Sequence, residues 1–356
     1  MAESLKINKL VSPSWSWLKI NDAELEFDFS LENISPAVKN AQNIEICENG
    51  SELKQNFPEL LSGTGKSSDS IFENSVPKGI LIPENAKIEK PLVLSYDFSE
   101  KTQALTSQVI VAGENSEATV IIVSSSEKKA AGFQALKTEV YAKPNSKIHI
   151  VKVQLLGGEF VQVDDTASYA AENSSITLTQ VELGGVKVYV GAGCNLKEYK
   201  GSFKSNLGYY LKGGQLLDMN FIVNHFGKKT LCEMNVAGSL ADSSKKTYRG
   251  TIDFKSGSAG SSGNEQEETL LLGENVVNNS MPVILCTEED ISGEHGATIG
   301  SLSDEILFYM EARGISRENA EKIIARAKIQ AVSSEINDEE TVEKINAEMN
   351  SIFGEE

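Results

Sequence analysis

The stretch 113–124, GENSEATVIIVS, joins a turn signal to a strand signal, and three other stretches of the chain repeat it. These are PENAKIEKPLVLS (83–95), KPNSKIHIVKVQ (143–154) and AENSSITLTQVE (171–182). Their asparagines are Asn85, Asn115, Asn145 and Asn173, spaced by 30, 30 and 28 residues. Asparagine tolerates the left-handed backbone of tight turns, and the alternating β-branched run after it is typical of a strand. A turn and strands that recur at this period predict a solenoid.

Strand-like runs such as SQVIVAG, TEVYA and VKVYVGAG also fill the chain between and after the repeats. The rhythm persists from Asn85 to Asn173 without the change that a Greek-key sandwich would impose. We therefore predict a mainly β protein whose core, residues 73–300, is a parallel β-helix that stacks Val, Ile and Leu from coil to coil. An antiparallel sandwich is the alternative. Residues 1–72, with Trp15 and Trp17, are expected to cap the solenoid or add an edge strand.

Helical periodicity replaces the β pattern in residues 301–356, which we interpret as a C-terminal helical domain. Ser303 and Ser316 are expected N-caps, Gly314 a left-handed stop, and a third helix begins near Asp338. Five consecutive apolar residues, 306–310, surround the first helix, so it is either sandwiched or open to a partner. The apolar stripe predicted for the second helix is Ala320, Ile323, Ile324, Ala327 and Ala331. The stripe predicted for the third is Val342, Ile345, Met349 and Ile352.

Charge and composition exclude several classes of function. Lys and Arg total 33 against 51 Asp and Glu, a formal net charge of −18, which disfavours nucleic acid and anionic membrane as partners. The sequence shows no signal peptide and no apolar span of about 20 residues. The four cysteines form no CxxC pair, which favours free thiols. A cytoplasmic location is the expectation.

No complete catalytic motif is present in the sequence. A nucleotide-binding loop, a GxSxG elbow and an HExxH motif are all missing, so we expect no enzymatic activity. The stretch KSGSAGSSGNEQEE (255–268) is interpreted as a flexible turn between coils. Among the three histidines, His149 alternates with isoleucine and His225 ends a strand. His295 follows an acid among glycines, where it could bind a metal, transfer a proton, or be an ordinary loop residue.

Three ordered motifs resemble one protein family. YRGTIDF (248–254), ETLLLGENV (268–276) and HGATIGSLSDEILFYMEARGIS (295–316) are similar to the SufB/SufD scaffolds of iron–sulfur cluster assembly, with a pattern closest to a short SufD. WSWLKINDAELE (15–26) is similar to the family's N-terminal signature. The resemblance implies a right-handed parallel β-helix whose C-terminal domain docks SufC, an ABC-type ATPase. It also implies pairing through the β-helix with a SufB protein or a second copy, around a transient iron–sulfur cluster and no stably bound cofactor.

The resemblance also assigns candidate residues. His295 matches a histidine held at the subunit interface, as a ligand of iron or of the cluster or a neighbour of one. The SufC-docking residues that it implies are Phe308, Tyr309, Arg313, Gly314, Ile315 and Ile324.

Departures from the family pattern keep alternatives open. No cysteine precedes LLLG, Gly296 stands where SufB has a glutamate, and Gly293 stands where many SufD proteins have a cysteine. Whether Cys286 or Cys232 reaches the interface is left open. These departures favour a supporting role beside a cysteine-bearing SufB, although a homodimer with SufC also fits. The alternatives are a structural adaptor that never touches iron and a β-helix enzyme acting on acidic polysaccharide. The charge of −18 and the lack of a signal peptide disfavour the enzyme.

Overall fold

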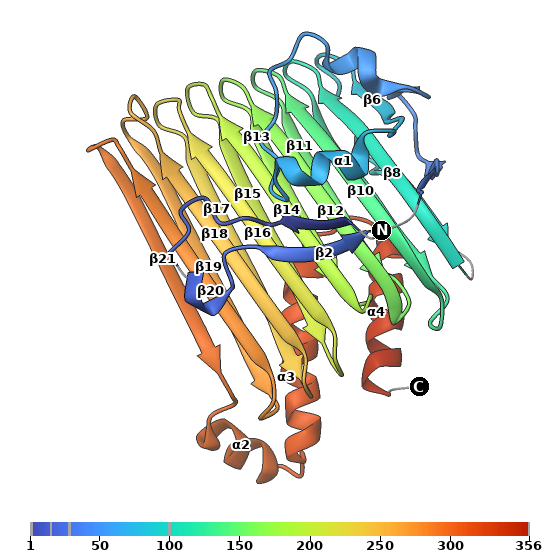
Figure 1. The fold of residues 1–356 in the computed structure, drawn as a ribbon, viewed down its shortest axis with the longest axis vertical. Coiled ribbons are helices and arrows are strands. Elements are labelled where there is room, and N and C mark those ends of the chain that lie inside the picture. Colours follow the sequence, from blue (N-terminus) through green and yellow to red (C-terminus); the bar gives the residue numbers. More distant parts are fainter. Residues whose placement is uncertain (1–2, 15, 28–29, 99–100, 355–356) are drawn as a thin grey trace.

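The computed structural model describes the chain except residues 1–2, 15, 28–29, 99–100 and 355–356, so Trp15 lies outside the described residues. The protein is mainly β, with 51% strand and 16% helix, and forms a β-solenoid of about eight turns with a small C-terminal helical region (Figure 1). This confirms the predicted fold class. Within the described residues, no helix is both long and apolar enough to span a membrane.

Two sheets of parallel strands form the solenoid, and the chain alternates between them. Sheet 1 contains β6 (Lys78–Ile82), β8 (Lys101–Ala112), β10 (Ala131–Ala142), β12 (Glu159–Ala170), β14 (Lys187–Leu196), β16 (Leu216–His225), β18 (Lys245–Phe254) and β20 (Val277–Cys286). Sheet 2 contains β7 (Leu92–Phe98), β9 (Glu117–Ser126), β11 (Lys147–Leu155), β13 (Ser175–Glu182), β15 (Ser202–Leu211), β17 (Leu231–Ala241), β19 (Ser261–Leu272) and β21 (Ile291–Gly300). Each of these strands pairs in parallel with the strand two places along the chain, which rules out the antiparallel sandwich.

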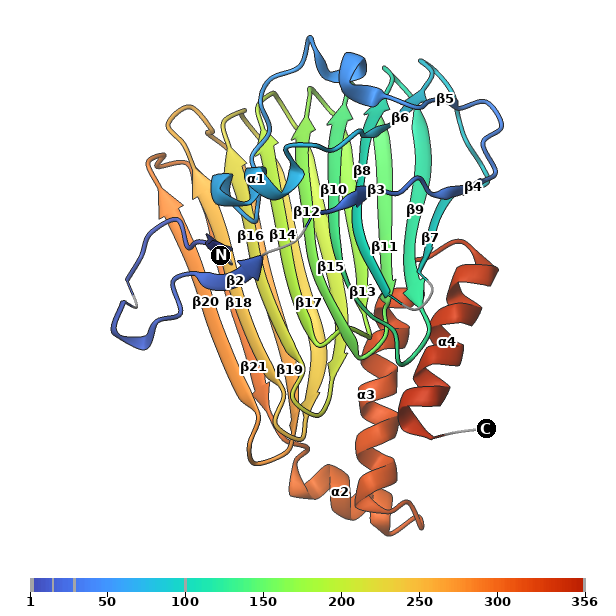
Figure 2. The same ribbon diagram turned by 45° about the vertical axis from the view of Figure 1, so that its right-hand side comes forward.

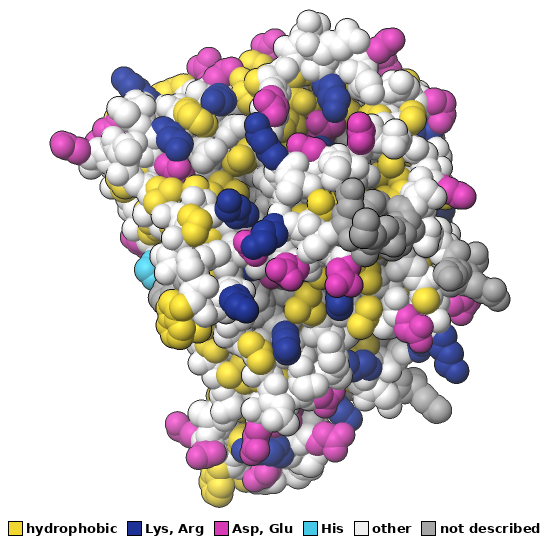
Figure 3. Space-filling model, in the orientation of Figure 1, with side chains coloured by type: hydrophobic (Ala, Val, Ile, Leu, Met, Phe, Trp, Pro, Cys, Tyr) yellow, Lys and Arg dark blue, Asp and Glu magenta, His cyan; other side chains and the backbone are white. Residues whose placement is uncertain are grey.

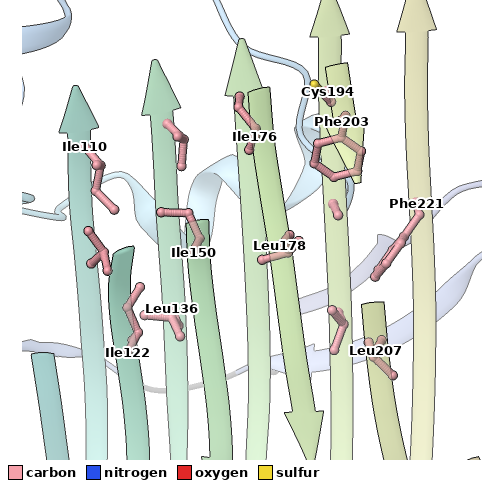
Figure 4. Close-up of a cluster of buried hydrophobic side chains, with 14 of the residues drawn as sticks. Ile110, Ile122, Leu136, Ile150, Ile176, Leu178, Cys194, Phe203, Leu207 and Phe221 are labelled. Carbon is pink, nitrogen blue, oxygen red and sulfur yellow. The ribbon is translucent and has the colours of Figure 1, made fainter. Parts of the chain in front are cut away.

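The core lies in the lumen between the two sheets. Alternate residues of each strand point inward, so Ile110 and Leu136 of sheet 1 face Ile122 and Ile150 of sheet 2 (Figure 4). These four side chains are at most 2% exposed. Burial of one such side chain contributes about 1.5–3 kcal/mol, and stacking repeats the contribution from coil to coil.

A ladder of left-handed turns runs along one edge of the solenoid. The four repeat asparagines have φ of 54–60°. The backbone N–H of each donates to a carbonyl in the turn of the next coil, as from Asn85 to Glu114 at 2.8 Å. The ladder continues beyond the four recognised repeats through Lys200, Lys229 and Gly260, which also have positive φ. The period found in the sequence therefore extends over three further coils.

The interpretation of 255–268 as a turn was wrong in its second half. The turn ends at Gly260 and β19 begins at Ser261. The strand escaped notice because its inward positions Glu265, Glu267 and Thr269 are polar, so the hydrophobic alternation that marks a strand is missing.

The N-terminal segment covers the outer face of sheet 1 and adds a strand at the first edge of each sheet (Figures 1 and 2). The elements are β1 (Glu3–Ile7), η1 (Ser16–Leu18), β2 (Ala23–Phe27), β3 (Glu32–Asn33), β4 (Ala37–Lys39), β5 (Glu45–Cys47), η2 (Gly50–Lys54), η3 (Lys66–Ser68) and α1 (Asp69–Phe72). β4 and β5 pair antiparallel with β7 and β6. The Asn8 side-chain amide donates to buried Asp218, which also accepts from Arg249. Trp17 is 79% exposed and does not pack into the core.

The C-terminal helices are α2 (Asp304–Glu311), α3 (Arg317–Ser333) and α4 (Glu339–Phe353), with α3 and α4 on the outer face of sheet 2 (Figure 2). The expected caps Ser303, Ser316 and Asp338 each accept a backbone N–H in the first turn. The predicted stripe of α4 is confirmed, because Ile345 and Met349 are fully buried.

The stripe predicted for α3 was wrong in part: Ala320 is buried and Ile324 is half-buried, as predicted, but the other three residues are not. Ile323, Ala327 and Ala331 are exposed. The packed face instead carries Ala325, Ile329 and Val332, which contact a cluster that includes Val151 and Val181 of sheet 2. Helical spacing allows either of two neighbouring faces, and the position of the sheet selects one of them.

Candidate functional site

The last coil of the solenoid is open to its surroundings. Within the described residues, β20 pairs only with β18 and β21 pairs only with β19 in the strand order, so one edge of each sheet is unpaired. His295 lies in the middle of β21, in register with Glu265 of β19. Strands in a sheet lie about 4.8 Å apart, and residues in register on parallel strands share a face. Glu265 is 2% exposed and points into the lumen. His295 is therefore on the luminal face, which the end of the solenoid leaves exposed.

A buried ion pair lies beside this end, one coil inward. Lys246 donates to Glu267, which also accepts hydrogen bonds from the hydroxyls of Ser280 and Thr269. Thr269 in turn contacts the Tyr209 hydroxyl at 2.9 Å. Burial lowers the pKa of Lys246, while the Glu267 carboxylate opposes that shift. The pair places opposite charges inside the lumen, each satisfied by the other, as the buried pair of Lys152 and Asp164 also does.

Glu265 is the titratable neighbour of His295. The pKa of Glu265 is raised to about 7, chiefly by burial and also by Glu267, while the Tyr248 hydroxyl and Lys246 oppose the shift. Gly250 of the facing strand makes room for the carboxyl group, because a Cβ at that position would overlap it. A carboxyl that gains or loses its proton near neutral pH next to an exposed imidazole can hold a cation or pass a proton.

Sequence reasoning missed Glu265 and Glu267. Both lie in the stretch that we had interpreted as a turn. The two glutamates are two residues apart and come just before an apolar run, with Gln266 and Glu268 on the alternate positions. This spacing would place them on one face of a strand, and it is the signal that could have identified them.

Among the residues that the structure describes, no cysteine lies beside His295. Cys286 is exposed and ends β20, where its thiol donates to the Glu288 carbonyl at 2.8 Å. His295 lies four residues into β21, roughly 13 Å along the strand from its start. Cys232 is 2% exposed and lies two strands inward, in register with Gly263 and then Gly293. Burial raises its pKa well above that of a free thiol, which disfavours the thiolate.

The other two histidines lie elsewhere, on β11 and β16. The His225 ring is buried and stacks on Phe254 at 4.6 Å between centroids, and burial lowers its pKa to about 4. His149 is on the outer face of sheet 2 and contacts the Thr179 hydroxyl at 2.9 Å. It lines a groove of about 530 Å³ with Lys87 and Asn337. Across the described part of the chain, no group of three or more His, Cys, Asp or Glu side chains is arranged to hold a metal ion.

A second candidate site is the surface formed by Ile306, Phe308, Tyr309, Arg313 and Ile323, called here the α2–α3 surface. Phe308 is 75% exposed, Tyr309 57%, Ile323 47% and Ile306 45%. The Arg313 guanidinium lies 4.4 Å from the centre of the Tyr309 ring. Helix α2 lies beyond the ends of the strands (Figure 1), while α3 is anchored on sheet 2.

The remaining docking candidates are next to these residues in the chain. Gly314 has a φ of 81° and lets the chain turn between α2 and α3. Ile315 and Ile324 are half-buried.

Comparison with known proteins gives one consistent result. The family model described as "SUF system FeS cluster assembly, SufBD core domain" matches residues 96–328. The iron–sulfur cluster assembly protein SufB of Bacillus subtilis is 24% identical over 316 residues, which cover 85% of this chain and 68% of that protein. SufD of the same organism is 21% identical over 262 residues, covering 72% and 60%. A SufBD family protein of Staphylococcus saprophyticus is 23% identical over 304 residues, covering 84% and 65%. The chain thus spans about two thirds of the length of these relatives.

Proposed function

Since this chain belongs to the SufBD family of the SUF iron–sulfur cluster assembly system, we propose that it is a non-enzymatic scaffold subunit of such an assembly complex. The subunit binds an ABC-type ATPase of the SufC kind through its C-terminal helices. It pairs with a second scaffold subunit through the end of its β-helix. A nascent cluster is held only transiently where the two scaffolds meet.

The observation that carries the proposal is the α2–α3 surface. Contiguous apolar and aromatic side chains that stay exposed on a folded protein mark interaction sites, and Tyr and Arg are both enriched among the residues that dominate binding energy. Phe308 and Tyr309 are held on a helix that makes little contact with the solenoid, while α3 fixes its position. A partner that moves on ATP hydrolysis could therefore pull on α3 and hence on sheet 2.

The open end supports the second part of the proposal. Unpaired strand edges invite pairing with another chain, and β20 and β21 offer one edge of each sheet. His295 on that end is the proposed iron or cluster ligand, with Glu265 adjusting the local charge. No thiol of the described residues lies beside His295, so the thiolate ligands would come from the partner. A cysteine-bearing SufB protein suits that need better than a second copy of this chain.

Capture of the ATPase tests the docking surface. We expect the ATPase of SufC type from the same genome to co-purify anaerobically with the wild-type chain and to be lost with Phe308→Asp. A charge in a desolvated aromatic anchor costs several kcal/mol of binding. Val76→Asp is the matched control, because Val76 is 53% exposed and lies between α1 and β6, away from the C-terminal helices. Equal capture by both variants would remove the α2–α3 surface from the proposal.

Iron retention separates the scaffold from the adaptor that never touches iron. The complex of this chain with its scaffold partner would be supplied anaerobically with Fe²⁺ and sulfide, then desalted. We expect His295→Ala to retain less iron than wild type while still binding the ATPase, because an imidazole ligand is lost and α2 is unchanged. His149→Ala serves as the control. If His295→Ala and wild type retain the same iron, the adaptor role replaces the ligand role.

A further inference from the structure

Lysines cluster on the turn edge of the solenoid in a protein of net charge −18. The turns that follow β14 and β16 carry Lys197, Tyr199, Lys200, Lys228 and Lys229, called here the basic turn patch. In Figure 3, dark blue side chains lie among magenta ones at the upper left, where Figure 1 shows the turns of the last coils. The turns of three earlier coils carry Glu84, Glu114 and Glu172 directly before the asparagine, and Lys143 in the remaining earlier turn pairs with Glu84. The patch is thus a local reversal of charge.

Two of these lysines occupy backbone positions that disfavour lysine. Lys200 and Lys229 have φ of 57° and 56° and follow Asn85, Asn115, Asn145 and Asn173 in the turn ladder. Their backbone N–H groups donate to Lys228 and Ala259, so they are equivalent to the asparagines. Left-handed backbone is unfavourable for a residue with a long side chain, whereas asparagine tolerates it. In two consecutive coils this position holds lysine in place of the more favourable asparagine, which points to a role for the lysine side chain.

Three of the lysine ammonium groups in the patch lie over aromatic rings. The Lys197 ammonium lies 3.4 Å from the centre of the Phe226 ring. The ammonium groups of Lys200 and Lys229 lie 5.2 and 5.8 Å from the Tyr199 ring, which is 39% exposed. Contacts of this kind hold cations in place while leaving their outer side open to an anion.

Neighbouring acids do not neutralise the patch. Among the residues that the structure describes, Lys197, Lys200, Lys228 and Lys229 make no ion pair with a carboxylate within 4.0 Å. The nearest acid in sequence, Glu198, accepts instead from the Tyr169 hydroxyl at 2.6 Å and the Glu172 amide at 3.0 Å. Lys255 in the following turn pairs with Asp253. Backbone N–H groups, first that of Gly257, lower the pKa of Glu288, and Lys228 contributes least to this shift, so Glu288 marks the border of the patch.

We propose that the basic turn patch binds an acidic polypeptide segment of a partner protein. The two turns that carry the lysines are neighbours, about 4.8 Å apart, so an extended segment of about two residues spans the distance between them. A nucleic acid or an anionic membrane is a longer polyanion and would meet the repulsion of the whole molecule. A short acidic segment meets only the local positive field. This surface is separate from the α2–α3 surface and from His295, so it stands independently of the proposed function.

Fluorescence anisotropy of a fluorescein-labelled oligo-glutamate peptide tests this proposal. The patch variant is Lys200→Asn/Lys229→Asn, which installs the turn residue of the earlier coils and should leave the fold intact or more stable. The control is Lys212→Asn/Lys245→Asn, which removes the same charge from two exposed lysines outside the patch. We expect the wild type and the control to bind the peptide with similar Kd, weakening as salt rises. The patch variant should bind about tenfold more weakly.

Three results would overturn the proposal. The first is an equal Kd for the patch variant and the control. The second is no binding of oligo-glutamate by the wild type at low salt. The third is preference for vesicles containing phosphatidylserine, or for a DNA oligonucleotide, over the peptide. A labelled oligo-glutamine peptide of the same length shows whether the charge is what is recognised.

Discussion

The side chain of Glu265 shows how burial changes what a single residue can do. Its neighbours in sequence, Asn264 and Gln266, are less buried, while Glu265 points into the lumen with Gly250 opposite. Glu267, two residues on, keeps a full complement of partners through Lys246, Ser280 and Thr269. One acid is therefore paired and structural, and the other titrates near neutral pH beside His295.

Glu265 makes stability depend on pH in a definite direction. Its pKa is about 7 in the folded protein against an ordinary 4.5, so between these values the folded state binds more protons than the unfolded chain. The free energy of unfolding therefore falls as pH rises through this window, by up to about 3 kcal/mol. Glu265→Gln cannot titrate and should lose less stability between about pH 5 and pH 8, measured by urea unfolding. Parallel curves for the two proteins would contradict the assignment.

At the scale of elements, the sequence was informative wherever local chemistry decides the structure. The turn asparagines, the caps Ser303, Ser316 and Asp338, and the stripe of α4 all depend on a residue and its near neighbours. The face of α3 and the extent of β19 depend on distant partners. Nothing near Ile329 in sequence shows that sheet 2 will cover it, and nothing near Glu265 shows that Lys246 and Tyr248 will line the same lumen.

The corrected face of α3 gives a direct comparison of two isoleucines. Ile329 is fully buried against sheet 2, so Ile329→Ala should destabilise the protein by about 2–5 kcal/mol through lost burial and a cavity. Ile323 is 47% exposed, so Ile323→Ala should change the free energy of unfolding by less than about 0.5 kcal/mol. Chemical denaturation of the two variants measures both values. A larger loss for Ile323→Ala would restore the stripe predicted from the sequence.

For the whole molecule, the covered faces explain why the contact surfaces lie where they do. The N-terminal segment covers sheet 1, α3 and α4 cover sheet 2, and β4 and β5 extend the first edge of each sheet (Figures 1 and 2). The described residues leave two prominent apolar or unpaired features, the α2–α3 surface and the last coil. The site candidates from sequence lie on these features, and their roles stay predictions because ligands and partners leave no trace in local patterns.

Hydrogen–deuterium exchange on the anaerobic complex tests the central claim most directly. The claim is that one surface of this chain serves the ATPase and another serves the second scaffold subunit. Addition of the ATPase of SufC type alone should protect backbone amides of 304–324, and addition of the scaffold partner should protect those of β20 and β21. Protection of both regions by either partner, or protection only in the groove around His149, would contradict the separation of the two surfaces.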